Sequence, residues 1–96
     1  MRRAEALEIL REHKQELAER YGVTRIGIFG SVARDEATEE SDMDVVVEMA
    51  KPDLFFMVHI KEMLESVTRC RVDIVRYRDR MNAFLRRRID EEAIYV

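Results

Sequence analysis

The stretch that decides the fold runs from Gly30 to Asp44 and reads GSVARDEATEESDMD. Gly30 and Ser31 close the β-rich run VTRIGIF, and Asp42 and Asp44 open a second apolar run, DMDVVVEM. Aspartate is a poor strand former, but side chains alternate along a strand, so the two aspartates share one face while Met43 and its apolar successors face the other way. The short connection predicts an antiparallel pair of strands, which brings the Gly-Ser pair beside two carboxylates.

Helical patterns flank these two strands. Residues 3–20 repeat leucine near helical spacing and end before Gly22, as helices often do. Pro52 suits the first turn of a helix, so a second long helix is predicted to start there. The predicted elements are helices over 3–20, 52–67 and 78–94, strands over 23–29, 42–49 and 70–77, and a short helical turn after the first strand.

This order of elements predicts an α+β fold. Three strands cannot form a sandwich by themselves, so the helices are expected to cover one face of a small, three-stranded mixed sheet. A chain of 96 residues suits one domain spanning 1–96. A domain of this size buries little surface, so any binding site is expected to be shallow or to be completed by a partner.

The charge balance and the cysteine count restrict the class of protein. Lys and Arg number 17 against 20 Asp and Glu, a formal net charge of −3, whereas a general nucleic-acid-binding protein needs a basic surface. The single Cys70 allows no internal disulfide and suits a reducing compartment. The N-terminus has no signal-peptide pattern, and no apolar run reaches the roughly 18 residues of a membrane span. A cytoplasmic protein is therefore predicted.

A third carboxylate is expected near the first two. In the third strand Val72 and Ile74 are predicted to face the helices, which turns Asp73 to the face of Asp42 and Asp44. Three carboxylates on one face repel each other unless a cation lies among them. Oxygen ligands at a shallow site suit Mg²⁺ best and Mn²⁺ next, and this spacing can converge on two ions about 4 Å apart.

The Gly-Ser pair has the features of a phosphate-binding turn. Gly30 lets a phosphate approach the backbone, Ser31 offers a hydroxyl and an N–H, and Arg34 follows one helical turn later. An anion cradle that faces a carboxylate cluster suits phosphoryl or nucleotidyl transfer. Neither GxxxxGK[ST] nor GxGxxG, the common alternative nucleotide motifs, is present.

The residues YGVTRIGIFGSVARDEATEESDMDVVVE resemble the signature of the minimal nucleotidyltransferases, the smallest members of the DNA polymerase β-like superfamily. That pattern is Gly-Ser, ten residues, Asp-x-Asp, and a third Asp on a later strand, here Asp73 in VDIV. The resemblance implies a polymerase β palm-like fold over nearly the whole chain. The sequence departs from the family pattern at one position, where Asp35 stands in place of the common glycine. Aspartate tolerates a left-handed turn, but its charge would be unfavourable close to a triphosphate.

The resemblance further implies an activity and a partner. Asp42 and Asp44 would hold two metal ions, Asp73 would hold the ion that activates an acceptor hydroxyl, and Gly30 with its neighbours Ser31 and Arg34 would hold the triphosphate. Many family members are antitoxins paired with a HEPN-domain toxin, and some transfer AMP from ATP to a toxin tyrosine. The expected function is therefore a metal-dependent nucleotidyltransferase, with ATP or another nucleoside triphosphate as substrate.

Two alternatives stay open at this stage. The chain could be a binding module that neutralises a toxin by forming a complex, or an RNA-modifying transferase acting alone. Surplus apolar residues of the 55–60 segment that stay exposed would mark a partner surface. The protein would then form a homo- or hetero-oligomer. The basic run Arg86–Arg88 is either a solvated helix face or a contact with phosphate or RNA. The acceptor, the base of the nucleotide and the oligomeric state are not determined by the sequence.

Overall fold

The computed structural model describes all residues, 1–96, and contains four helices and four strands. Every element predicted from the sequence is present, and one short strand is added at the C-terminus. In chain order the elements are α1 (Arg3–Tyr21), β1 (Val23–Phe29), α2 (Gly30–Ala33), β2 (Met43–Met49), α3 (Leu54–Thr68), β3 (Val72–Arg76), α4 (Ala83–Glu92) and β4 (Ile94–Tyr95).

The sheet is mixed, and its strand order is β3-β2-β1-β4. β1 is antiparallel to β2, as predicted, and β2 is parallel to β3. The sheet has four strands rather than the expected three, because β4 pairs with Gly27 and Ile28 at the other edge of β1. A side chain at Gly27 would collide with the backbone of Ile94, so this glycine allows the close approach of β4.

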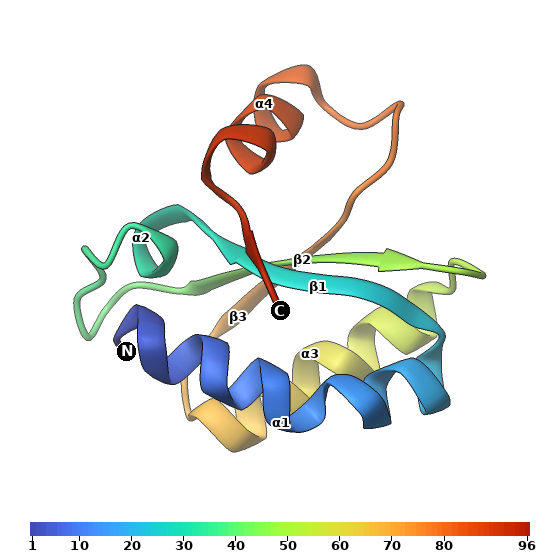
Figure 1. Cartoon of the computed structure of the whole chain (residues 1–96), viewed down its shortest axis with the longest axis horizontal. Coiled ribbons are helices and arrows are strands. Elements are labelled where there is room, and N and C mark those ends of the chain that lie inside the picture. The colour runs from blue at the N-terminus through green and yellow to red at the C-terminus, as the bar shows by residue number, and fades with distance from the viewer.

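The two faces of the sheet are covered differently (Figure 1). Helices α1 and α3 cover one face, where Ile28, Val45 and Val47 are fully buried. The expectation that helices lie on one face is met by these two, but α4 packs on the opposite face, where it forms a second apolar cluster with β1 and β2. Strand alternation turns Val46 to that face, and a strand that is apolar on both faces needs cover on both. The buried members of the second cluster are Phe29, Val46, Met81 and Ile89.

Local signals fix where the helices begin and end. Gly22 follows α1 with φ of 69°, the left-handed C-cap predicted for it. α3 begins after Asp53, whose carboxylate accepts the N–H groups of Phe55 and Phe56, so Pro52 precedes the cap and is not in the first turn. Asn82 caps α4 in the same way, and α4 is therefore shorter than the predicted 78–94 helix.

Asp35 ties the turn after α2 to the start of α1. Its φ is 60°, the left-handed conformation expected at this position of the motif. Its carboxylate accepts the backbone N–H of Arg3 at 3.0 Å, while Arg2, the N-cap residue, provides no side-chain cap. Asp35 therefore supplies an N-terminal cap for α1 from a distant part of the chain, and its carboxylate is engaged by that helix rather than free beside a nucleotide.

Three substitutions of Asp35 should separate the cap from the backbone strain. Asp35→Ala is expected to lower the free energy of unfolding by about 1 to 2 kcal/mol, because it removes the cap and places a Cβ-only side chain at positive φ. Asp35→Asn keeps an acceptor and the left-handed preference, and Asp35→Gly loses the cap but relieves the strain, so both should stay within about 0.5 kcal/mol of the wild type. Urea denaturation measures all three. A glycine variant clearly more stable than the wild type would show that the contact with Arg3 contributes nothing.

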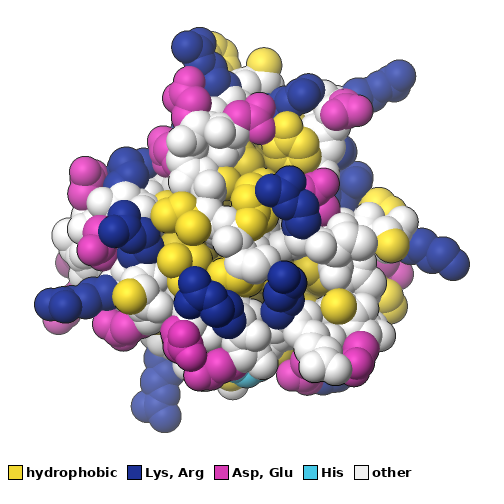
Figure 2. All heavy atoms as spheres, viewed as in Figure 1, with side chains coloured by type: hydrophobic (Ala, Val, Ile, Leu, Met, Phe, Trp, Pro, Cys, Tyr) yellow, Lys and Arg dark blue, Asp and Glu magenta, His cyan; other side chains and the backbone are white.

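The surface carries both signs of charge. Figure 2 shows Lys and Arg side chains interspersed with Asp and Glu over one face, with hydrophobic atoms exposed between them. This distribution agrees with the mild net charge of −3. None of the helices combines the length and the apolar composition that a membrane crossing requires.

Candidate active site

The end of β1 brings Gly30 against the start of β2. Phe29, the last residue of β1, is the register partner of Asp44, and Gly30 follows it with φ of 72°. A Cβ at Gly30 would overlap the carboxylate of Asp44. The positive φ favours glycine, and any side chain here would push the Asp44 carboxylate from its position, so the Gly-Ser turn and the start of β2 fit together as one unit.

Asp44 and Asp73 lie opposite each other on neighbouring parallel strands. They are register partners of β2 and β3, and both point away from the α1–α3 core, because the adjacent residues Met43 and Val72 are buried in it. Asp44 is half-buried and Asp73 is exposed. The structure therefore brings together two of the three carboxylates that were expected on one face, on the side of the sheet that carries α4.

The surroundings of Asp44 disfavour its negative charge. Burial is the largest cause that raises the pKa of Asp44, and repulsion from the Asp73 carboxylate raises it further. The Arg88 guanidinium acts in the opposite direction and lowers the pKa, while Asp42 and Glu92 add smaller raising effects. A cation placed between these carboxylates would remove the repulsion.

Asp42 is placed less directly than the other two carboxylates. It is exposed, and its Oδ1 accepts a hydrogen bond from Nε of Arg71 at 3.1 Å. In these side-chain positions no three His, Cys, Asp or Glu residues are arranged to hold a metal ion together. The structure therefore brings Asp44 and Asp73 together but leaves Asp42 paired with Arg71.

The turn from Gly30 to Arg34 holds an anionic side chain of the protein itself, that of Glu92. Oε1 of Glu92, the last residue of α4, accepts the backbone N–H of Gly30 at 3.0 Å and NH1 of Arg34 at 2.8 Å. Arg34 also contacts Glu36, with 3.3 Å between its Nε and Oε2. Gly30, Ser31 and Arg34 lie at this turn as the sequence predicted, their role toward a phosphate stays a prediction, and Glu92 was not predicted here. Its position in α4 gave no signal, since only the path of α4 over the sheet brings it here.

Arg88 is a second residue that sequence reasoning did not assign to the site. It lies on α4, four residues before Glu92, with its guanidinium carbon 5.7 Å from the centre of the Phe29 ring. Its effect on the pKa of Asp44 places its charge near the carboxylates. The run Arg86–Arg88 was a candidate phosphate contact, but the sequence did not indicate which member would face the site. Arg88 is that member, since Arg86 contacts Tyr77 and Arg87 pairs with Glu91.

Removing the charge of Asp44 should stabilise the protein without ligands. Asp44→Asn is expected to raise the free energy of unfolding at neutral pH by about 0.5 to 1 kcal/mol, allowing for solvent screening of a half-exposed group. The raised pKa means that the carboxylate destabilises the fold only where it is ionised. The difference from the wild type should therefore be largest at neutral pH and disappear as the pH falls through the raised pKa towards the ordinary value. Denaturation at several pH values measures it, and a variant less stable at neutral pH would contradict the repulsion.

Comparison with known proteins decides the family. The family model of the nucleotidyltransferase domain matches residues 10–96. The chain belongs to this nucleotidyltransferase family. The predicted resemblance, which covered nearly the whole chain, is confirmed.

Two curated relatives align with this nucleotidyltransferase over most of their length. The chain is 39% identical over 89 residues to the protein adenylyltransferase MntA of Thermococcus cleftensis, covering 92% of this chain and 89% of that one. It is 37% identical over 94 residues to a protein of Methanocaldococcus jannaschii whose provisional name is protein adenylyltransferase, covering 97% and 96%.

Solved structures agree on the fold. A protein provisionally described as a minimal nucleotidyltransferase superimposes with a TM-score of 0.78 at 39% identity, covering 98% of this chain and 95% of that one. An MNT antitoxin in complex with a tri-AMPylated HEPN toxin of Shewanella oneidensis gives a TM-score of 0.71 at 17% identity, covering 97% and 70%. The second likeness establishes the shared fold alone.

Proposed function

We propose that this nucleotidyltransferase transfers AMP from ATP to a tyrosine hydroxyl of a HEPN-type toxin and acts as its antitoxin. The observation that carries the proposal is the placement of Asp44 against Gly30 on one side and opposite Asp73 on the other. This puts an anion-binding turn and a carboxylate pair side by side. The names of the relatives, which are protein adenylyltransferases, support AMP as the transferred group and a protein as the acceptor.

In the proposed reaction, the acceptor hydroxyl oxygen forms a bond to the α-phosphorus of ATP. The bond from that phosphorus to the bridging oxygen breaks, and pyrophosphate leaves. The Gly30 N–H, Ser31 and the Arg34 guanidinium hold the β- and γ-phosphates. Asp73 accepts the hydroxyl proton on its carboxylate. The contribution of the protein is mainly to position the two substrates and to neutralise charge.

Mg²⁺, or Mn²⁺ in its place, fits the oxygen-only donor set of the carboxylates. Asp42 and Asp44 would hold two ions, and Asp73 would share the ion nearer the acceptor. When bound, such ions supply positive charge against the triphosphate. The raised pKa of Asp44 supports this assignment, because a cation would relieve the repulsion that raises it.

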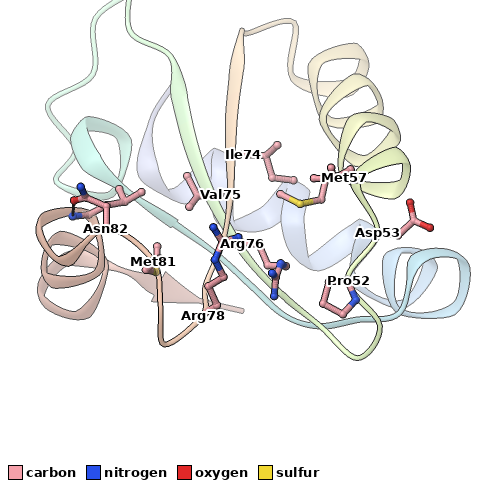
Figure 3. Close-up of a pocket in the computed structure, with 11 residues that line it drawn as sticks. Pro52, Asp53, Met57, Ile74, Val75, Arg76, Arg78, Met81 and Asn82 are labelled. Atoms are coloured by element: carbon pink, nitrogen blue, oxygen red, sulfur yellow. Dashed lines mark hydrogen bonds between the residues drawn. The ribbon is translucent and has the colours of Figure 1, made fainter.

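A groove beside β3 is the proposed docking surface for the partner (Figure 3). β3 is an edge strand, and a hollow of about 560 Å³ lies between the start of α3, β3 and the start of α4. Arg76 and Arg78 outweigh the one acidic residue of the groove, Asp53, whose carboxylate caps α3, so the groove suits an apolar surface of the toxin with acidic residues at its rim. The apolar residues that line it are Pro52, Leu54, Met57, Ile74, Val75, Met81 and Leu85.

The sequence predicted a surplus of apolar side chains in the 55–60 segment, and the structure divides that segment. Phe55 is 78% exposed, whereas Phe56 packs on Tyr21 with 5.3 Å between the ring centres. Outside this segment, Leu54 and Phe84 are exposed at 81% and 83%, one at the start of each helix beside the groove. These exposed residues suit complex formation, which is also all that a second candidate function requires, in which the chain neutralises the toxin by binding it without transfer.

Labelled ATP distinguishes the two functions. The protein is incubated with Mg²⁺, a HEPN-type toxin from the same genome, and ATP labelled at either the α- or the γ-phosphate. Nucleotide transfer predicts that the α-label becomes attached to the toxin and that the γ-label leaves in pyrophosphate. A stable complex with neither label on the toxin would favour the binding module, and the γ-label on the toxin would indicate a kinase instead.

A further inference from the structure

Glu92 occupies the two donors to which the proposed function assigns the triphosphate. Its Oε1 accepts from the Gly30 N–H at 3.0 Å and from NH1 of Arg34 at 2.8 Å. Its side chain is 23% exposed, so this ion pair is better shielded than the other contact of Arg34, with Glu36, whose side chain is 68% exposed. A carboxylate that accepts from a backbone N–H and a guanidinium makes the same charge-assisted contacts that a phosphate oxygen makes.

We propose that Glu92 is an internal occupant of the phosphate subsite, which the triphosphate must displace in order to bind. This inference rests on the proposed function, because it takes the Gly30–Arg34 turn to be the place of the phosphates. Two anions cannot share the same two donors, so each must weaken the binding of the other. Glu92 then sets the nucleotide affinity without contacting the reacting atoms.

The fold allows Glu92 to leave by rotating its side chain alone. Ile89, one turn earlier on α4, is buried in the second apolar cluster. On the other side, Ile94 is paired with Ile28 in β4, and the Ala93 N–H donates to the Ile89 carbonyl. The backbone on both sides of Glu92 is therefore held in place. Displacement needs no unfolding of α4.

The charges nearby favour the exchange. Glu92 is one of the groups that raise the pKa of Asp44, so its negative charge is repelled by that carboxylate and is retained by its two donors. When Glu92 turns away, Arg34 is released from it and Arg88 stays on the same side of α4. Both guanidiniums can then face a phosphate. Nucleotide binding therefore replaces the Glu92 carboxylate, which Asp44 repels, with a triphosphate that carries more negative charge.

Measurement of nucleotide affinity in matched variants tests the proposal. The probe is a non-hydrolysable ATP analogue with Mg²⁺, titrated calorimetrically into the wild type, Glu92→Gln and Glu91→Gln. Glu91→Gln is the control, because this substitution removes the same charge from α4, but from a residue that pairs with Arg87 and not with the Gly30 turn. Glu92→Gln is expected to lower the dissociation constant by about threefold to tenfold, since the neutral amide is a weaker competitor. Glu91→Gln should change it by less than about twofold.

The outcomes separate this inference from the proposed function. Analogue binding by the wild type with equal or weaker binding by a folded Glu92→Gln variant would overturn the inference and leave the proposed function standing. Failure of all three proteins to bind the analogue would overturn both. A second measurement needs no substitution: the amide signal of Gly30 in the NMR spectrum should move when tripolyphosphate is added to the wild type. A signal unmoved at saturating ligand would also overturn the inference.

Discussion

Replacing Asp42 and Asp44 together by Asn is expected to lower the rate of nucleotide transfer by at least about 10³-fold, while the complex with the toxin still forms. Asp44 lies against Gly30 and Asp42 precedes Asp44 by two residues on the chain, whereas the proposed docking groove is lined by other residues. The double variant removes two negative charges but changes no buried apolar side chain. Transfer is measured with α-labelled ATP, and complex formation by co-purification.

The reciprocal substitution is Leu54→Glu, which places a charge in the groove. Leu54 is exposed and begins α3, where an acidic side chain suits the helix. The complex should weaken, while the melting temperature should stay near that of the wild type. Val67→Glu, near the other end of α3 and also exposed, is the matched control and should leave the complex intact. A double Asn variant that retains transfer would contradict the assignment of the carboxylates, and a Leu54→Glu variant that still binds normally would contradict the groove.

Asp73→Asn is expected to lower the rate of transfer by about 10²- to 10⁴-fold and to leave the nucleotide affinity within a few-fold of the wild type. The strand order carries this separation of roles. β2 lies between β3 and β1, so Asp73 and Gly30 lie on opposite sides of Asp44. A nucleotide held at Gly30 and Asp44 leaves Asp73 for the acceptor.

The two steps are measured separately for this variant. Calorimetry with a non-hydrolysable ATP analogue reports binding, and single-turnover transfer with a saturating toxin concentration reports the chemical step. Asp44→Asn serves as the comparison, since it should lose both. If Asp73→Asn loses nucleotide affinity as severely as Asp44→Asn, Asp73 belongs to the triphosphate site and the division of roles is wrong.

The parts of the structure that follow from local chemistry could be predicted from the sequence. Alternation in DMDVVVE and VDIV places Asp44 and Asp73 on one face, and the register of β2 and β3 then aligns them. The antiparallel pair of β1 and β2 follows from their short connection, and it places Gly30 at Asp44. Gly22 ends α1 because its glycine adopts positive φ without strain.

The parts that depend on long-range packing could not be predicted in the same way. β4 has two residues, too few to show alternation. The path of α4 follows from burial of Val46 on the second face, and only the run of three valines in β2 pointed to it. The contacts of Glu92 with Gly30 and of Asp35 with Arg3 join residues 62 and 32 positions apart, so no local pattern contains them.

Attachment of AMP to the partner by this nucleotidyltransferase can be read from the intact mass of the partner. A HEPN-type toxin from the same genome is incubated with the protein, ATP and Mg²⁺, and its mass is measured with the Asp42→Asn/Asp44→Asn variant as the control. Transfer of AMP by the protein predicts a mass increase equal to one or more AMP groups, located on tyrosine by fragmentation, with the wild type only. A toxin of unchanged mass that is nevertheless neutralised equally by the wild type and by the double variant would contradict it.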